Sequence, residues 1–353
     1  MTSPNWKAEY AKIRPSYEAY EKKLRELVIE ILMHAGIDVF QVEGRVKTPD
    51  SFEEKIQRKA GKYADPLSDM TDLVGLRVIA YYLEDVDRIV ELLSGEFEVC
   101  KEHSMNKQDE LAPDQFGYTS NHLVIRIGDR SERPEWAKYA DISVELQVRT
   151  MSQNAWAAVH HKLSYKRVEE VPASLQRRLF RLSALFEMAD EQFSAIRQAT
   201  SEISTEYSDN LKQGNLAIAL NAESISAYLA TSTKFRRMAS LAEEEFDLGV
   251  GGPLKADDEY RSTLIRIIEY LGGETIEDLD RLMPDDQTSR KVLHVLQTIR
   301  SREDRIGFDI YAFLGDMLVT AHGLNKSAFN DLYTGRWEHF LEARRMLRSL
   351  EQE

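Results

Sequence analysis

The sequence predicts an α/β (α+β) protein, in which a mixed sheet flanked by helices is followed by an all-helical part. Short apolar, β-branched runs alternate with helical segments up to roughly residue 170. From Ser152 onward, nearly every segment has the 3.6-residue period of a helix. We therefore expect two domains, residues 1–200 and residues 201–353.

The individual elements follow from local signals. A first helix is expected to begin at the N-cap Ser3-Pro4 and to run towards Gly36. A second is expected to start at a capping box around Asp50-Ser51 and to reach Tyr63. Apolar runs predict strands at 39–46, 74–82, 96–101, 122–127 and 142–149, and a helix at 86–93. We expect loops at 103–117 and 249–253, and a helix beyond residue 172 with one apolar face that includes Leu179, Phe186 and Phe193.

The composition excludes several classes of protein. The net charge is −14, of which residues 201–353 carry −9 and residues 1–200 carry −5, whereas a general nucleic-acid binder would be basic. No apolar run is long enough to span a bilayer, and the N-terminus is too polar for a signal peptide. The single cysteine, Cys100, excludes an internal disulfide and predicts a reducing, cytoplasmic compartment.

A basic stripe is predicted on the second helix. Ser51, Lys55 and Lys59 follow one another at intervals of four residues, so they share one helix face. Arg45 and Lys47 precede this helix. Ammonium groups beside a helix N-terminus suit a polyphosphate, although a solvated basic face has the same pattern.

A carboxylate enters the second predicted strand. In DLVGLR, residues 72–77, Asp72 precedes the apolar run and Arg77 lies within it. Charges inside sheets need partners. Asp72 is therefore a candidate metal ligand, with pairing to Arg77 or the capping of a turn as structural alternatives.

The segment FGYTSNH, residues 116–122, combines a turn residue with an aromatic ring. Gly117 permits a tight turn, and Tyr118 offers a face on which a base can stack. A buried tyrosine at the start of a strand is the structural alternative.

The last predicted strand has one fully polar face. In VELQVRT, residues 144–150, alternation places Glu145, Gln147 and Arg149 on one side and valine and leucine on the other. A central strand of this kind usually lines a site, and an open, solvated sheet face is the alternative. Asn154 follows on the next predicted helix.

In this order, the motifs closely resemble the synthetase domain of the RelA/SpoT family of alarmone synthetases. They are R-x-K-x-x-x-S-x-x-x-K-x-x-x-K, D-L-V-G-L-R, G-Y-x-S-x-H and E-x-Q-x-R-T-x-x-x-N-x-W-A, and the resemblance covers approximately residues 15–200. It implies a nucleotidyltransferase-like fold and a Mg²⁺-dependent GTP pyrophosphokinase of the stringent response. Such an enzyme moves the β,γ-pyrophosphate of ATP to the 3′-hydroxyl of GDP, GTP or GMP and so makes (p)ppGpp. No His-Asp dipeptide occurs, so the hydrolase domain of bifunctional relatives is not expected.

The resemblance also implies a role for each motif residue. Arg45 and Arg77 would stack on the two faces of the adenine. The triphosphate would be held by Lys47, Ser51, Lys55 and Lys59. Mg²⁺ would be held by Asp72 and Glu145, and Glu145 would also assist deprotonation of the attacking hydroxyl. The acceptor nucleotide would be held by Tyr118, His122, Gln147, Arg149 and Asn154.

Two departures from the family pattern leave the acceptor open. Asp114 stands at or near a position where many small synthetases have lysine, and His160 replaces the glutamate of W-A-x-x-E-H. One alternative is a toxic small synthetase that pyrophosphorylates the 3′ end of tRNA or makes (p)ppApp, with residues 201–353 as inhibitor or sensor. Another is an inactive nucleotide-binding module. Homo-oligomer formation is also left open.

Overall fold

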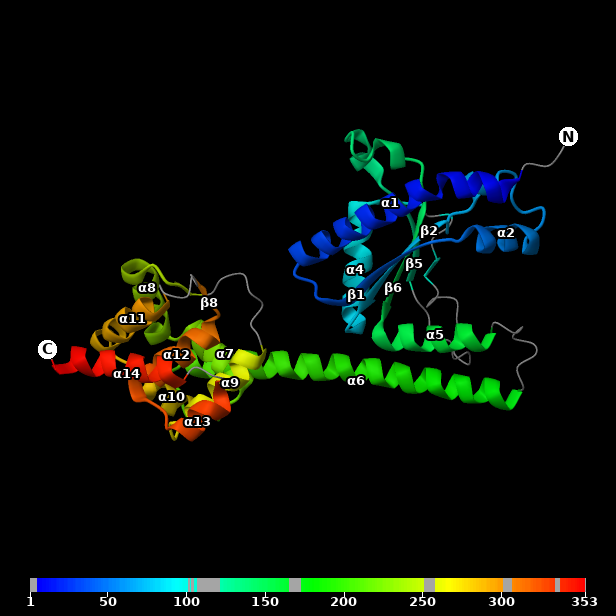
Figure 1. Ribbon diagram of the computed structural model, residues 1–353. Helices are drawn as coiled ribbons and strands as arrows, with labels where there is room; N and C mark the ends of the chain where they lie inside the picture. Colours follow the sequence, from blue (N-terminus) through cyan, green and yellow to red (C-terminus); the bar gives the residue numbers. More distant parts are fainter. Residues whose placement is uncertain are drawn as a thin grey trace. The chain divides into compact units, whose positions relative to one another are not determined.

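The computed structural model of the chain divides into two compact units, Met1–Arg197 and Gln198–Glu353 (Figure 1). The structure describes residues 5–100, 102, 105–106, 121–164, 173–250, 258–300, 307–333 and 337–352. Within these ranges, no helix has both the length and the apolar composition needed to cross a membrane.

The first unit consists of a mixed sheet and the helices around it, as the sequence predicts. The strands are β1 (Val39–Val46), β2 (Val74–Ala80), β3 (Glu98–Val99), β4 (Met105–Asn106), β5 (Asn121–Arg126) and β6 (Val144–Thr150). The helices are α1 (Trp6–His34), α2 (Pro49–Arg58), α3 (Pro66–Asp69), α4 (Leu83–Glu96), α5 (Met151–Ser164) and the first part of α6 (Ala173–Lys212), with 3-10 turns at Gly128–Glu132 and Ala137–Tyr139. The predicted loop at 103–117 lies mostly outside the described residues.

The strand order is β1-β2-β6-β5-β3, and β4 also pairs with β5. Among the described strands of this sheet, β2 and β6 are the only parallel pair, and the other pairs are antiparallel. The register places Glu145 opposite Gly75 and Gln147 opposite Arg77. Because paired residues of neighbouring strands point to the same side and side chains alternate along a strand, Arg77 of β2 faces the same side of the sheet as Gln147 and Glu145 of β6.

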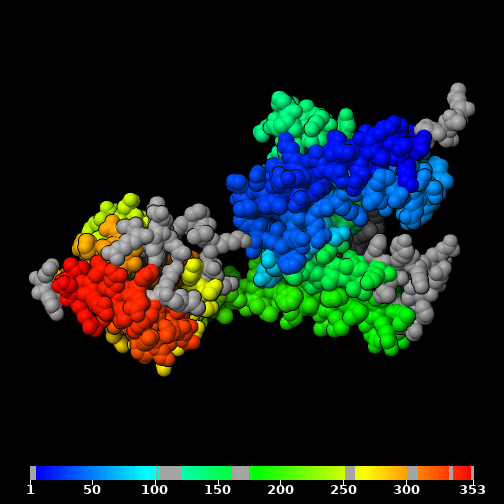
Figure 2. All heavy atoms as spheres, in the orientation of Figure 1, coloured from blue at the N-terminus to red at the C-terminus, as the bar shows by residue number. Residues whose placement is uncertain are grey.

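The other side of the sheet is apolar and carries α1 and α4. Val144, Leu146 and Val148 of β6 are fully buried in one core with Leu24 and Val28 of α1, which confirms the predicted alternation. In the space-filling view, α1 (dark blue) forms a continuous part of the outer surface of this unit (Figure 2). The polar side chains of β2 and β6 are thus left on the opposite side of the sheet from α1 and α4.

Predicted helix boundaries differ from the structure in α1 and α2, and also in α4, which spans Leu83–Glu96 instead of 86–93. Helix α1 is capped by Asn5, whose side chain accepts a hydrogen bond from the backbone of Ala8; the expected cap at residues 3–4 lies outside the described residues. Helix α2 is capped by Thr48, with proline at its first position, and it ends at Arg58 instead of Tyr63. The capping box predicted around Asp50-Ser51 is wrong because both residues already lie in the first turn of α2, and the N-cap is Thr48, whose side chain accepts from the backbone N–H of Ser51.

Helix α6 packs on the first unit through polar contacts. Ser183 and Asp190 are buried, and the Thr150 hydroxyl at the end of β6 donates a 2.6 Å hydrogen bond to Asp190. By contrast, Leu185 and Phe193, which the sequence places on the apolar face of this helix, are 60% and 50% exposed. The contacting side of α6 therefore includes buried polar residues, and part of the predicted apolar face is exposed.

The second unit is helical, as predicted. Its helices are the end of α6 together with α7 (Ala222–Thr231), α8 (Thr233–Phe246), α9 (Asp258–Tyr270), α10 (Ile276–Leu282), α11 (Asp286–Arg300), α12 (Ile310–His322), α13 (Lys326–Leu332) and α14 (Trp337–Gln352). They enclose a separate core that includes Ile267, Leu314 and Leu318. The loop predicted at 249–253 is wrong at its start, where β7 (Gly249–Val250) pairs in parallel with β8 (Gly307–Phe308).

Candidate active site

The polar side of the sheet holds a small cavity over β1, β2 and β6. Its volume is about 60 Å³, and it is lined by Glu43, Gly44, Arg45, Gly75, Leu76, Arg77, Glu145 and Gln147. An added Cβ at Gly75 would lie 3.2 Å from Arg45 Nε. The absence of a side chain at Gly75 therefore lets the Arg45 side chain pass over β2 towards β6. The cavity thus brings together arginines and carboxylates from three strands.

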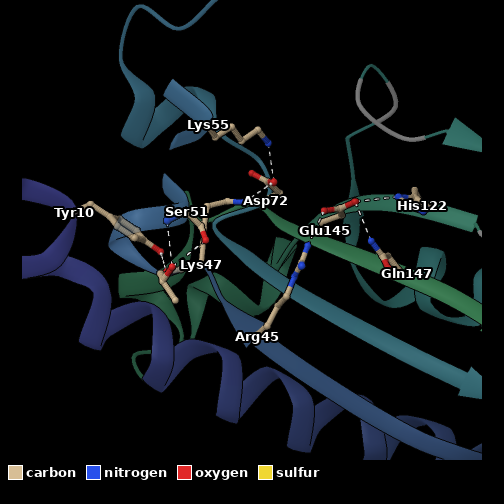
Figure 3. A network of polar contacts seen from close by, with 10 residues as sticks. Tyr10, Arg45, Lys47, Ser51, Lys55, Asp72, His122, Glu145 and Gln147 are labelled. Carbon is tan, nitrogen blue, oxygen red and sulfur yellow. Dashed lines mark hydrogen bonds and ion pairs between the residues drawn. The ribbon is translucent and has the colours of Figure 1, made fainter. Parts of the chain in front are cut away.

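A second polar cluster lies at the entrance to β2. Asp72 Oδ2 accepts from Lys55 Nζ at 2.6 Å and lies 3.0 Å from Lys47 Nζ, and all three side chains are less than one-fifth exposed (Figure 3). Burial favours a higher pKa for Asp72, but the hydrogen bond from Lys55 and the charge of Lys47 outweigh it and hold the pKa below its usual range. Asp72 is therefore an ionised carboxylate paired with two lysines.

Glu145 is the centre of the third group of contacts. Its Oε1 atom lies 2.9 Å from His122 Nδ1 and accepts from Gln147 Nε2 at 3.2 Å, while its Oε2 atom lies 4.0 Å from an Arg45 nitrogen (Figure 3). The hydrogen bond from His122 is the main cause that lowers the pKa of Glu145 to about 2, against the effect of burial. The carboxylate is ionised at every physiological pH.

Arg149 adds a buried positive charge to the same sheet face. Its side chain donates to the Gln147 side-chain oxygen, and the residue is only 5% exposed. Burial, and then the nearby charge of Arg77, lowers the pKa of Arg149 to about 10, so it stays protonated at neutral pH. Guanidinium groups in such surroundings attract anions.

Comparison with known proteins shows which family this part of the chain resembles. The family described as "Region found in RelA / SpoT proteins" matches residues 44–170, which include all of β2, β5 and β6. We refer to residues 44–170, which match this family model, as the RelA/SpoT domain. Two relatives from Bacillus subtilis (strain 168) are similar over most of their lengths. GTP pyrophosphokinase YjbM is 29% identical over 60% of this chain and 98% of its own, and GTP pyrophosphokinase YwaC is 26% identical over 55% and 91%.

Solved structures also resemble the chain. The crystal structure of small alarmone synthetase 1 from Bacillus subtilis has a TM-score of 0.46 and 27% identity, covering 55% of this chain and 98% of that one. A GTP pyrophosphokinase family protein from Streptococcus pneumoniae has a TM-score of 0.47 and 25% identity, covering 55% and 96%.

The RelA/SpoT domain brings most of the predicted site residues together. Those on the sheet or beside its ends are Arg45, Lys47, Asp72, Arg77, His122, Glu145, Gln147 and Arg149. Ser51 and Lys55 are on α2, but Lys59 follows the end of that helix, so the predicted three-residue stripe is shorter by one member. Asn154 lies in the first turn of α5, directly after β6. Tyr118 lies outside the described residues.

The structure shows which residues Asp72, Arg77 and His160 contact. Asp72 pairs with two lysines, whereas Arg77 pairs with Glu43 at 3.0 Å. His160 stacks on Trp156 with ring centroids 4.6 Å apart. Asp114, the other departure from the family pattern, lies outside the described residues.

The donor atoms present fit a hard divalent cation. Asp72 Oδ1 is buried and has no hydrogen-bond partner among the residues that the structure describes, which leaves it free to coordinate. Glu145 Oε2 is likewise not used by His122 or Gln147. The described part of the chain contains no group of three or more His, Cys, Asp or Glu side chains that could hold a metal ion. Mg²⁺ needs only one or two carboxylates, however, when phosphate oxygens complete its coordination shell.

Sequence reasoning missed some residues that shape the site. The Thr48 hydroxyl caps α2 and bonds to the Ser51 hydroxyl at 3.0 Å, and the Tyr10 hydroxyl donates to the Lys47 carbonyl at 2.8 Å (Figure 3). Glu43, the partner of Arg77, was also missed. The E-x-R pattern of residues 43–45 on a predicted strand was a signal for it, since both side chains must face one side.

Proposed function

We propose that the RelA/SpoT domain transfers the β,γ-pyrophosphate of ATP to the 3′-hydroxyl of a guanine nucleotide. The observation that carries the proposal is the pair of ionised carboxylates, Asp72 and Glu145, among cations on one polar sheet face. The relatives' name, GTP pyrophosphokinase, supports this reaction and the guanine acceptor. The product of such a transfer is a (p)ppGpp-type alarmone.

In the proposed complex, Arg45 and Arg77 hold the purine of ATP. Both line the cavity, and planar guanidinium groups stack well on an aromatic base. Lys47 and Lys55 hold the phosphates and share their positive charge with Asp72. Ser51 lies within the first turn of α2, where a helix N-terminus favours an anionic group.

Asp72 Oδ1 and Glu145 Oε2 are the atoms that would hold Mg²⁺. When bound, the ion neutralises negative charge that develops on the transferred group. Asp72 and Glu145 supply its negative ligands, while the lysines neutralise the remaining phosphate oxygens. His122 and Gln147 fix the orientation of Glu145 through its other oxygen.

The low pKa of Glu145 bears on how the attacking hydroxyl loses its proton. A carboxylate with a pKa of about 2 is a weak base at neutral pH. The negative charge of Glu145 and its orientation are therefore its main contributions to the reaction. The attacking hydroxyl would lose its proton late, after the bond to phosphorus has begun to form. Arg149, buried on the same face, would hold acceptor phosphate oxygens close to the attacked phosphorus.

The test is a direct assay of transfer. The purified full chain is incubated with Mg²⁺, with ATP labelled in its β-phosphate, and with GDP, GTP, ATP or tRNA in turn. We expect label in the 3′ position of the guanine nucleotide and stoichiometric AMP. Label at the 3′ position of an adenine nucleotide or of tRNA would mean that the proposed guanine acceptor is wrong and that ATP is still the pyrophosphate donor. No labelled product with any acceptor would overturn the proposal and favour an inactive nucleotide-binding module.

A further inference from the structure

The two arginines of the cavity are held by carboxylates on opposite sides. Arg45 extends from β1 across Gly75 to within 4.0 Å of Glu145 on β6. Arg77 lies on β2 and reaches back to β1, where its Nη1 atom is 3.0 Å from Glu43 Oε2. Glu43 and Arg77 are directly opposite each other in the antiparallel β1–β2 register.

Two features of its surroundings disfavour the observed position of the Arg77 side chain. Its Nε atom is buried and lacks a hydrogen-bond partner among the described residues, which is unfavourable for a guanidinium group. Its charge is also close enough to Arg149 to lower the pKa of that residue. Glu43 opposes both effects, because it accepts a charge-assisted hydrogen bond and adds a negative charge beside the two arginines.

Glu43 also keeps the two arginines from sharing one partner. Among the described residues that line the cavity, the carboxylates are Glu145 and Glu43. Without Glu43, the guanidinium of Arg77 is drawn by Coulomb attraction towards Glu145, where Arg45 already lies. A planar base can lie between the two guanidinium groups only if they are held apart, and their separate carboxylate partners draw them apart.

We propose that Glu43 is a positioning residue for ATP, which acts by holding Arg77 in the orientation that receives the purine. The inference rests on the proposed function, since it concerns the same nucleotide site. Glu43 contacts Arg77 and takes no part in the transfer itself. Its loss therefore weakens the capture of ATP and leaves the transfer of the bound nucleotide nearly unchanged.

The test compares Glu43→Gln with wild type and with Glu91→Gln, a matched control that removes the same charge from an exposed position on α4. We expect Glu43→Gln to raise the KM for ATP about tenfold, with kcat within about twofold and the KM of the acceptor unchanged. Equilibrium binding of a non-hydrolysable ATP analogue, without acceptor, should weaken by the same factor. A merely structural loss would lower the amount of active enzyme, and therefore kcat, instead of KM.

A double-mutant cycle shows whether Glu43 acts through Arg77. In an Arg77→Gln background, Glu43→Gln should change ATP affinity less than about twofold, because its partner is already gone. Equal effects of Glu43→Gln in both backgrounds, or no effect in either, overturn the inference while an active wild type keeps the proposed function. A wild type that binds no ATP overturns both.

Discussion

Replacing Glu145 with glutamine should destabilise the first unit, although removing a charge from an active site often stabilises a protein. The side chain keeps its shape but loses the charge that His122 and Arg45 stabilise. Folding lowers the pKa of Glu145 from 4.5 to about 2. Since one pKa unit corresponds to about 1.4 kcal/mol, the ionised group contributes about 3 kcal/mol of folding free energy at pH 7.

The sign of the pH dependence follows from a pKa that is lower in the folded state. The contribution is fully present above the unfolded pKa of 4.5 and is lost as the pH falls towards 2. The difference in unfolding free energy between wild type and Glu145→Gln should therefore shrink from about 3 kcal/mol at pH 7 to about 1 kcal/mol at pH 3.

Urea unfolding followed by tryptophan fluorescence measures this difference. A Trp337→Phe background leaves Trp6, Trp136 and Trp156, all in the first unit, as the reporters. Replacing the exposed Glu26 of α1 with glutamine is the control and should change little. A difference that is absent at pH 7, or that stays constant down to pH 3, would refute the assigned pairing of Glu145.

Three further predictions concern the site and the residues that shape it. Asp72→Asn should lower turnover by about a hundredfold or more, because a proposed ligand of Mg²⁺ is lost, while the far-UV circular dichroism stays unchanged; wild-type turnover would contradict this. Gly75→Ala should raise the KM for ATP by up to about tenfold, since its Cβ would displace Arg45, and an unchanged KM would refute the role of the glycine. Thr48→Ala should lower the unfolding free energy by about 1 kcal/mol through loss of the α2 cap, measured by the same urea titration, whereas Thr48→Ser should restore it.

Much of the fold was predictable because its signals are local. The strand at 39–46 agrees with the structure at both ends, and the alternation of 144–150 placed Glu145, Gln147 and Arg149 on one face correctly. Helix boundaries were less predictable. Several residues near Thr48 are able to cap a helix, and only the folded backbone shows which of them meets the free N–H groups.

The apolar face of α6 shows a second kind of limit. Its periodicity correctly predicted a helix, and the structure leaves Leu185 and Phe193 of that face largely exposed. The contact with β6 is made instead through Asp190, which accepts from Thr150. Periodicity identifies which residues share a face, but it does not identify what that face contacts.

By itself, the sequence determined the candidate residues of the site and, for those on β6, the face on which they lie, because side-chain alternation depends only on the local backbone. The tertiary structure decided the pairing among them. Asp72 is neutralised by Lys47 and Lys55, and Arg77 by Glu43, because strand order and register bring β1 beside β2. The low pKa of Glu145 likewise depends on His122 from the neighbouring strand β5. Such contacts join residues far apart in the chain, so no local pattern specifies them.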